Sequence, residues 1–173
     1  MNAFFSSLFN YCPLIWLFHS RTLNNKINRL HERCLRIIYD DTESSFDQLL
    51  TKDKSVCHHH RSLQLLAVEL YKVVKNISPL FLNEIFIRNE KQINTRSDSF
   101  FKSRPIKSTL NGSESLSFLA PKIWDMIPLE LKDEKSVTLF KRGIKNWIPH
   151  DCPCRICKKY VPGVGFVTLA KNL

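Results

Sequence analysis

The sequence predicts a mostly α-helical protein. Apolar residues recur at steps of three and four along most of the 173-residue chain, whereas the two-residue alternation typical of half-buried strands is scarce. Serines and prolines stand where these periodic segments begin or end, as they do at helix boundaries. The apolar fraction of 43% is ordinary for a chain of one-domain length, so a buried core is expected. The expected architecture is a helical bundle with a long basic loop and an irregular cysteine-containing tail.

The strongest helical pattern lies in residues 23–38 and contains two parallel stripes. An apolar stripe, with alternating steps of four and three, consists of Leu23, Ile27, Leu30, Cys34 and Ile37. A basic stripe runs beside it and consists of Lys26, Arg29, Arg33 and Arg36. We expect the apolar stripe to pack on a core and the basic stripe to contact phosphate, carboxylate or water.

Three further helices are predicted before residue 88. Ser45 can cap a short helix that carries apolar residues on one face. A second long helix follows over residues 62–76, where apolar positions trace one face. Ser78 and Pro79 provide an N-cap and a first helical position for another short helix that ends near Phe86.

The helical period disappears between residues 88 and 112, where the chain is polar and basic. This stretch exceeds the roughly 12 to 15 residues of an ordinary connection, which indicates a functional loop or two short extended pieces. Phe100 and Phe101 stand beside Lys102 and Arg104, so bases can stack next to phosphate contacts there. The alternative is a mobile basic linker whose phenylalanines pack back onto the core.

Helical signals return after the loop. Ser113 or Ser115 can cap a segment that ends at Pro128, and Pro121 marks an entry point or a kink in it. Ser136 then begins a helix with an apolar seam, and its basic flank consists of Lys141, Arg142 and Lys145. The chain therefore divides into a helical region (1–87), a basic loop or linker (88–112), a helical region (113–148) and a cysteine-cluster tail (149–173).

The first eighteen residues are apolar but do not predict a targeting or membrane-spanning segment. They lack a positively charged start, contain Ser6, Ser7, Asn10 and Pro13, and fall short of the roughly 20 apolar residues that cross a bilayer. We therefore expect no membrane association and an intracellular location, either nuclear or cytoplasmic. The apolar run is expected to pack on a domain that precedes it.

The tail contains the strongest local chemistry in the sequence. His150, Cys152, Cys154 and Cys157 offer one imidazole and three thiols, a combination that zinc favours. Their spacing is compressed compared with that of ordinary structural zinc sites, so all four converge on one ion with difficulty. We expect Cys154 and Cys157 to act as a pair, with His150 or Cys152 and one outside ligand. Candidates for that outside ligand are His58, His59 and His60; reduced thiols in a surface tail are the alternative.

Charge and glycine content narrow the classes of function. The formal charge of +10 favours acidic partners, of which RNA and DNA are the commonest. Only four glycines occur, which argues against a glycine-rich phosphate-binding loop. His58, His59 and His60 are consecutive and point in different directions, so they do not predict a catalytic centre.

Six segments carry a resemblance to a known family. They are NYCPLIWLFHSRTLNNKINRLHERCLRIIYDD, FDQLL, HHRSLQLLAVELYKV, ISPLFLNEIF, LSFLAPKIWDMIPLEL and FKRGIKNWIPHDCPCRICKKYV. In this order they resemble the carboxy-terminal part of reverse transcriptases from non-LTR retrotransposons of the jockey-like LINE kind. The resemblance implies that residues 23–38 belong to a helical thumb and the segment after it, which grip the RNA and DNA template and primer. It also implies a preceding palm domain as a partner.

The polymerase motif of that family is missing from this chain. The family's palm carries a Tyr or Phe, Ala, Asp, Asp motif and an earlier aspartate, which together hold two Mg²⁺ ions. Tyr39, Asp40 and Asp41 lack the spacer residue and follow a long helix, so no catalytic residue is expected here. Mg²⁺ is expected only for the missing palm, and zinc is the one candidate metal for this chain.

The resulting functional prediction is a reverse transcriptase fragment that binds nucleic acid without sequence specificity. Phosphate contacts are expected first from the basic stripe on residues 23–38. The second candidates are Lys102, Arg104, Lys141, Arg142 and Lys145. The alternative is a helical protein-interaction module whose basic face is only solvated and whose tail carries a small zinc site.

Overall fold

The computed structural model describes most of the chain between residues 11 and 168. The described residues are 11, 14, 15, 17–89, 99–106, 112, 115–149, 152, 154, 156–161 and 165–168. Their helices are α2 (Arg21–Tyr39), α3 (Phe46–Asp53), α4 (His58–Val74), α5 (Leu80–Ile85), α6 (Leu116–Asp125), α7 (Leu129–Lys132) and α8 (Val137–Ile144). Two short strands, β1 (Lys158–Val161) and β2 (Gly165–Thr168), pair antiparallel in the tail. The predicted mostly helical fold is confirmed.

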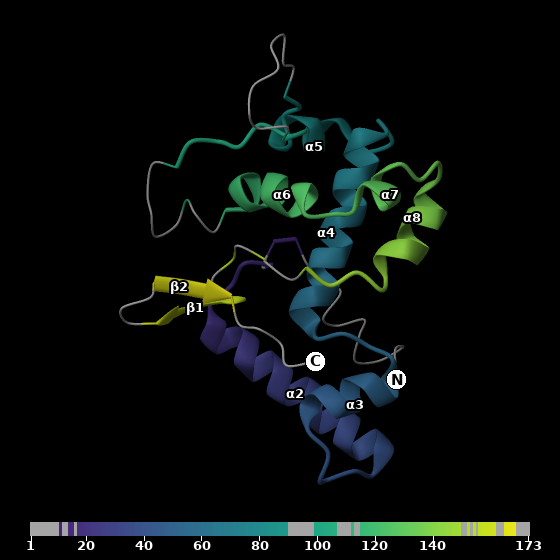
Figure 1. The fold of residues 1–173 in the computed structure, drawn as a ribbon, viewed down its shortest axis with the longest axis vertical. Coiled ribbons are helices and arrows are strands. Elements are labelled where there is room, and N and C mark those ends of the chain that lie inside the picture. The colour runs from purple at the N-terminus through teal and green to yellow at the C-terminus, as the bar shows by residue number, and fades with distance from the viewer. Residues whose placement is uncertain are drawn as a thin grey trace.

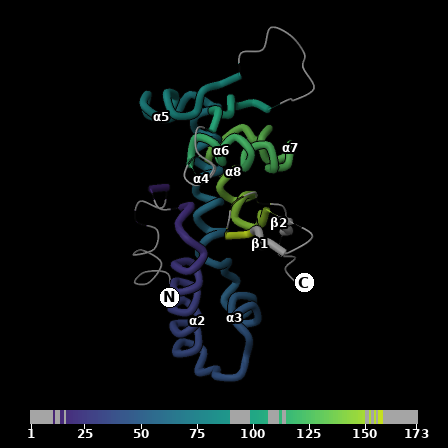
Figure 2. Tube along the Cα trace, turned by 90° about the vertical axis from the view of Figure 1, so that its left-hand side faces the viewer, coloured from purple at the N-terminus to yellow at the C-terminus, as the bar shows by residue number. Residues whose placement is uncertain are grey.

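The long helix α4 organises the molecule (Figure 1). It runs through the middle of the structure, with α5 to α8 around its upper part and α2 and α3 at its lower end. A view turned by 90° shows the same division (Figure 2). Direct contacts join α4 to α2, α6 and α8.

The main core surrounds α4. Leu63, Leu66 and Leu70 are fully buried on this helix and share a cluster with Ile123 of α6 and Phe140 of α8. The Tyr71 and Phe140 rings stack with their centroids 4.2 Å apart, which adds to the area they bury. A helix that is buried on nearly every side forms the centre of a domain, and α4 takes that position.

Helices α2 and α3 form a hairpin with its own small core. That core contains Leu35 of α2, Leu49 and Leu50 of α3, and Cys57 just before α4. The predicted cap of α3 is confirmed: the Ser45 hydroxyl accepts from the Gln48 amide, and the Gln48 side chain accepts from the Ser45 amide. The capping box of α3 and the small shared core therefore both stabilise the hairpin.

The buried face of α2 differs from the predicted one. Of the five predicted stripe residues, only Ile27 is buried, whereas Leu23, Leu30 and Ile37 are 44%, 50% and 81% exposed. The face against α3 and α4 instead carries Asn24, Ile27 and Leu35. It is rotated by roughly 100° from the exposed stripe, which corresponds to one residue along a helix. Helical period alone could not choose between two faces this close.

The basic loop packs partly on the core. Phe101 is buried and its ring lies against those of Phe86 and Trp124, with centroids 6.2 and 5.8 Å away. The backbone of Phe101 forms an isolated antiparallel bridge with that of Arg88, so two ends of the predicted loop meet as short extended pieces. Residues 90–98 and 107–111 lie outside the described part of the chain.

Candidate metal centre

The first turn of α4 places one histidine toward the tail. The helix begins at His58, four residues before the predicted start, and Cys57 is its N-cap. His58, His59 and His60 are all buried, and successive side chains on a helix point roughly 100° apart. Only one of three consecutive histidines can therefore face a given neighbour, and His59 is the one that faces the cysteines of the tail.

The three tail cysteines converge on His59. Cys152 and Cys154 are fully buried, and Cys157 is half-buried. The Cys154 Sγ lies 3.3 Å from the His59 Nε2 and 3.4 Å from the Cys152 Sγ. One ligand atom from each of the four residues lies within 4.8 Å of every other. None of these three cysteines forms a disulfide bond with another described residue.

These distances fit a tetrahedral zinc site. Zinc binds thiolate sulfur at about 2.3 Å and imidazole nitrogen at about 2.0 Å, so tetrahedral geometry separates two sulfurs by about 3.8 Å and sulfur from nitrogen by about 3.5 Å. Two of the separations between ligand atoms are 3.4 and 3.3 Å, and all of them are within 4.8 Å. Shifts of less than about 1 Å would bring all four atoms onto one ion.

The electrostatics of the cluster favour a cation among the sulfurs. Hydrogen bonds with Cys152 and Cys154, followed by burial, raise the pKa of the Cys157 thiol far above its ordinary value. The Cys157 thiol therefore stays protonated unless a positive charge joins it, and a bound metal ion deprotonates the thiols that coordinate it. The His59 Nδ1 is buried without a hydrogen-bond partner among the described residues, so these residues do not supply the contact that usually orients a metal-binding imidazole.

A neutral histidine stands beside this cluster. Burial, and after it the charges of the nearby His19, His59 and His31, lower the pKa of His58 to about 4. Its Nε2 lies 3.4 Å from the Ser62 hydroxyl on the next turn of α4. His58 is therefore uncharged near neutral pH and adds no positive charge next to the candidate site.

The structure brings together most of the predicted metal ligands. Cys152, Cys154 and Cys157 converge as predicted, and His59 is one of the three outside ligands that were considered. His150 lies outside the described residues. Sequence spacing could not select His59 from its two neighbours, because that choice depends on the rotation of α4 relative to a tail more than ninety residues away.

The basic stripe of α2 is largely accessible. Lys26, Arg29 and Arg33 are exposed. Arg36 instead holds the turn that follows α2: its Nη2 lies 2.7 Å from the Glu32 Oε1, and its guanidinium donates to three backbone carbonyls of the turn. Arg36 therefore has a structural role in addition to its charge.

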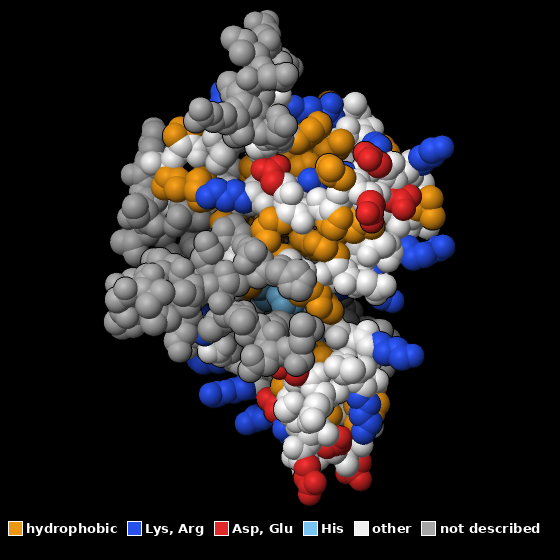
Figure 3. Space-filling model, viewed as in Figure 1, with side chains coloured by type: hydrophobic (Ala, Val, Ile, Leu, Met, Phe, Trp, Pro, Cys, Tyr) orange, Lys and Arg blue, Asp and Glu red, His pale blue; other side chains and the backbone are white. Residues whose placement is uncertain are grey.

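The second group of residues predicted to contact phosphate lies in the basic loop and at the C-terminal end of α8. Lys102, Lys141, Arg142 and Lys145 are exposed, and the Arg104 guanidinium donates to the Glu84 carbonyl over 2.9 Å. In the view of Figure 3, Lys and Arg side chains stand around the edges of the molecule and do not form one continuous patch. Lys26, Arg29 and Arg33 of α2 are exposed and follow one another at steps of three and four residues, so they form a row on one side of that helix.

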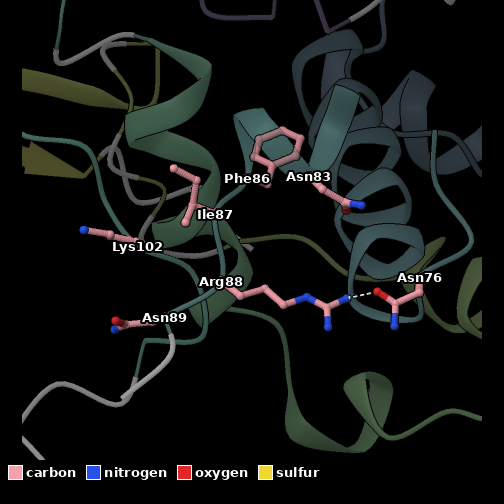
Figure 4. Close-up of a pocket in the computed structure, with 7 residues that line it drawn as sticks. All are labelled: Asn76, Asn83, Phe86, Ile87, Arg88, Asn89 and Lys102. Carbon is pink, nitrogen blue, oxygen red and sulfur yellow. Dashed lines mark hydrogen bonds between the residues drawn. The ribbon is translucent and has the colours of Figure 1, made fainter. Parts of the chain in front are cut away.

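A pocket of about 570 Å³ lies between the C-terminal end of α4, α5 and the start of the basic loop. Arg88 lines this pocket. Its Nη2 donates to the Val73 and Val74 carbonyls over 2.6 and 3.1 Å and to the Asn76 side chain. Figure 4 shows Lys102 and Asn89 extending away from Arg88. Arg88 thus stabilises the last turn of α4, and the polar groups of the pocket do not converge.

Tyr39, Asp40 and Asp41, which resemble the aspartate motif of the polymerase palm, stabilise the end of α2 and the turn after it. Tyr39 donates to the Asp53 carboxylate over 2.9 Å, and Asp40 is the left-handed C-cap of α2. Asp41 accepts hydrogen bonds from the amide and the hydroxyl of Ser44. The three residues end α2 and begin the turn to α3.

No family model, curated protein or solved structure matches the chain. Among the described helices, none is both long and apolar enough to cross a membrane.

Proposed function

We propose that this chain binds a zinc ion through His59, Cys152, Cys154 and Cys157, and that the ion fixes the tail on the first turn of α4. The observation that carries the proposal is the convergence of the four ligand atoms within 4.8 Å. Three thiolates and one imidazole are a typical ligand set of structural zinc sites, which are closed and four-coordinate. The role of the ion is therefore structural.

The burial of the thiols supports a metal rather than a reduced surface tail. Cys152 and Cys154 are fully buried, whereas thiols of a surface tail would contact water. The 3.4 Å between their sulfurs is also much longer than the roughly 2.05 Å of a disulfide bond. Zinc suits this mixed set because it is borderline-soft and accepts both sulfur and nitrogen.

Metal analysis of the purified full chain tests this proposal. We expect one zinc per chain, and we expect Co²⁺ substitution to give the absorption of a tetrahedral thiolate site. Cys154→Ser and His59→Ala should lose most of the metal, because each removes one ligand. Cys34→Ser is the matched control, since Cys34 lies on α2 and is not part of the cluster. A wild-type chain without metal, or equal metal content in all variants, would contradict the proposal.

We also propose that this chain binds nucleic acid, as a carboxy-terminal fragment of a non-LTR retrotransposon reverse transcriptase. The supporting observations are the resemblance of its segments, the formal charge of +10 and the exposed row of Lys26, Arg29 and Arg33. Such a row neutralises phosphates and releases counterions, which gives affinity without sequence specificity. In the parent protein the template and primer would be held here, next to a preceding palm domain that performs polymerisation.

Salt-dependent binding tests the nucleic-acid proposal. The triple variant Lys26→Gln, Arg29→Gln, Arg33→Gln should weaken RNA and DNA binding and lower the slope of log affinity against log salt by about 0.7 to 0.9 per lost contact. The control triple variant Lys54→Gln, Lys75→Gln, Lys135→Gln removes the same charge from exposed positions outside α2. Equal affinities and slopes for the two triple variants would contradict a role for α2 and favour a solvated basic face.

A further inference from the structure

Helix α2 presents a straight apolar stripe to solvent. Leu23, Leu30 and Ile37 are spaced by seven residues, which is close to two helical turns, so they line up along one side. Their exposed fractions are 44%, 50% and 81%. Isolated exposed apolar residues are common, but an aligned set on one regular helix is typical of an interaction surface.

The stripe lies on a well-supported helix. On another side of α2, Asn24, Ile27 and Leu35 are buried against α3 and α4. The helix begins with the Ser20 hydroxyl accepting from an amide of its first turn and ends at the left-handed Asp40. Figures 1 and 2 show α2 at the lower end of the molecule, away from α5 to α8. A partner would therefore meet a preformed surface.

A regular row of cations borders the stripe. Lys26 follows Leu23 by three residues and precedes Leu30 by four, and Arg33 has the same relation to Leu30 and Ile37. Residues at these spacings are neighbours on a helix surface. Both cations are exposed. The surface thus combines an apolar ridge with a positively charged edge.

We propose that this surface binds an amphipathic helix with an apolar seam and an acidic edge from a protein partner. The three exposed residues supply one apolar position per heptad for a partner helix, whereas Ile27 between the first two is buried in the fold. The charge of α2 selects the partner: the helix carries five Lys and Arg residues and one carboxylate. A second copy would bring Lys26 and Arg33 near like charges, whereas an acidic edge complements them.

This partner site is independent of the zinc site and adjoins the proposed nucleic-acid surface. Lys26 and Arg33 serve both surfaces, but Leu30 and Ile37 serve only the helix partner. Substitution of the two apolar residues therefore separates the two activities. It also leaves the buried face of α2 unchanged, so we expect the variant to fold.

Binding of two synthetic peptides to the full chain tests the proposal. Both peptides are three-heptad helices with identical leucine seams; one has glutamate edges and the other lysine edges. We expect the glutamate peptide to bind at least about tenfold more tightly, and Leu30→Ser with Ile37→Ser to weaken that binding by at least about tenfold. The control variant Leu80→Ser with Leu129→Ser, which changes leucines that are 83% and 73% exposed on α5 and α7, should bind as wild type does.

Circular dichroism and zinc content establish that all variants are folded. Absence of glutamate-peptide binding, or equal binding by the Leu30→Ser, Ile37→Ser variant, would overturn the proposal. A dimer of the chain that the same variant converts to a monomer would assign the stripe to a second copy and also overturn it. Loss of RNA or DNA affinity in that variant, without peptide binding by wild type, would assign the stripe to nucleic acid instead.

Discussion

Asp41 shows how a single residue fixes the turn between α2 and α3. Its carboxylate accepts from the Ser44 amide over 3.0 Å, from the Ser44 hydroxyl over 2.8 Å and from the Lys52 ammonium over 3.3 Å. The backbone hydrogen bond from Ser44, then its hydroxyl, and then Lys52 lower the pKa of Asp41 to about 2. Because the pKa is lowered on folding, this carboxylate stabilises the fold above its ordinary value of 3.8 and loses that effect as the pH falls toward 2.

Substitutions around Asp41 should separate these causes. We expect Ser44→Ala to raise the pKa of Asp41 by more than Lys52→Gln does, because the hydroxyl has the larger effect. Neither variant should restore 3.8, since the Ser44 amide still donates. An NMR titration of the Asp41 carboxyl carbon gives the measurement. A larger rise in Lys52→Gln would show that charge, rather than hydrogen bonding, controls this turn.

At the scale of elements, one side chain joins α4 to the end of α8. The Gln64 amide nitrogen donates to the Lys145 carbonyl over 2.9 Å and to the Trp147 carbonyl over 3.0 Å. Gln64 is only 1% exposed. Because these carbonyls follow the last turn of α8, the glutamine satisfies acceptors that the helix itself leaves open. It therefore fixes the path of the chain toward the cysteine tail.

Loss of the two Gln64 hydrogen bonds should destabilise the protein. Gln64→Ala leaves two carbonyl oxygens without their donor, and we expect it to reduce the free energy of unfolding by about 2 to 3 kcal/mol. Gln48→Ala is the matched control: Gln48 is exposed in the α3 capping box, so its loss should cost about 1 kcal/mol or less. Denaturant unfolding of both variants provides the comparison. Similar losses would mean that Gln64 does not join the two helices.

The whole molecule has two cores of unequal size that meet at the start of α4. The main core includes α4, α6, α8 and the tail cysteines, whereas the α2–α3 hairpin relies on Leu35, Leu49, Leu50 and Cys57. His59 lies where these two parts join, two residues after Cys57 of the hairpin core. A zinc ion at this point would therefore connect the tail to the junction between the cores.

Hydrogen exchange should show this division. We expect amides of α2 and α3 to exchange faster than those in the middle of α4, because fewer buried contacts must be lost to expose them. Removal of zinc with a chelator should accelerate exchange in the first turn of α4 and at residues 152–157, with little change in α8. Mass spectrometry of the zinc-loaded and chelated chain measures both effects. Uniform acceleration would indicate that the metal stabilises the fold as a whole.

Sequence patterns determined the local features of this protein. Ser45 and Ser136 cap their helices as predicted, because a cap depends only on hydrogen bonds to amides two or three residues away. The mostly helical class follows from the same short-range periodicity. Residue type and proximity in the sequence alone indicate the three cysteines as candidate ligands, and the structure brings them together. The basic nature of α2 was likewise evident from spacing.

Tertiary structure decided which faces and partners these elements use. Burial of Leu35 rather than Leu30 depends on how α3 and α4 approach α2, and a rotation of one residue exchanges the two faces. Selection of His59 rather than His58 or His60 depends in the same way on the direction from which the tail arrives. Distant segments set these rotations, and no pattern within a single helix records them. The sequence thus determined the helices and the types of the candidate ligands, and long-range packing determined the exposed stripe and the fourth candidate ligand.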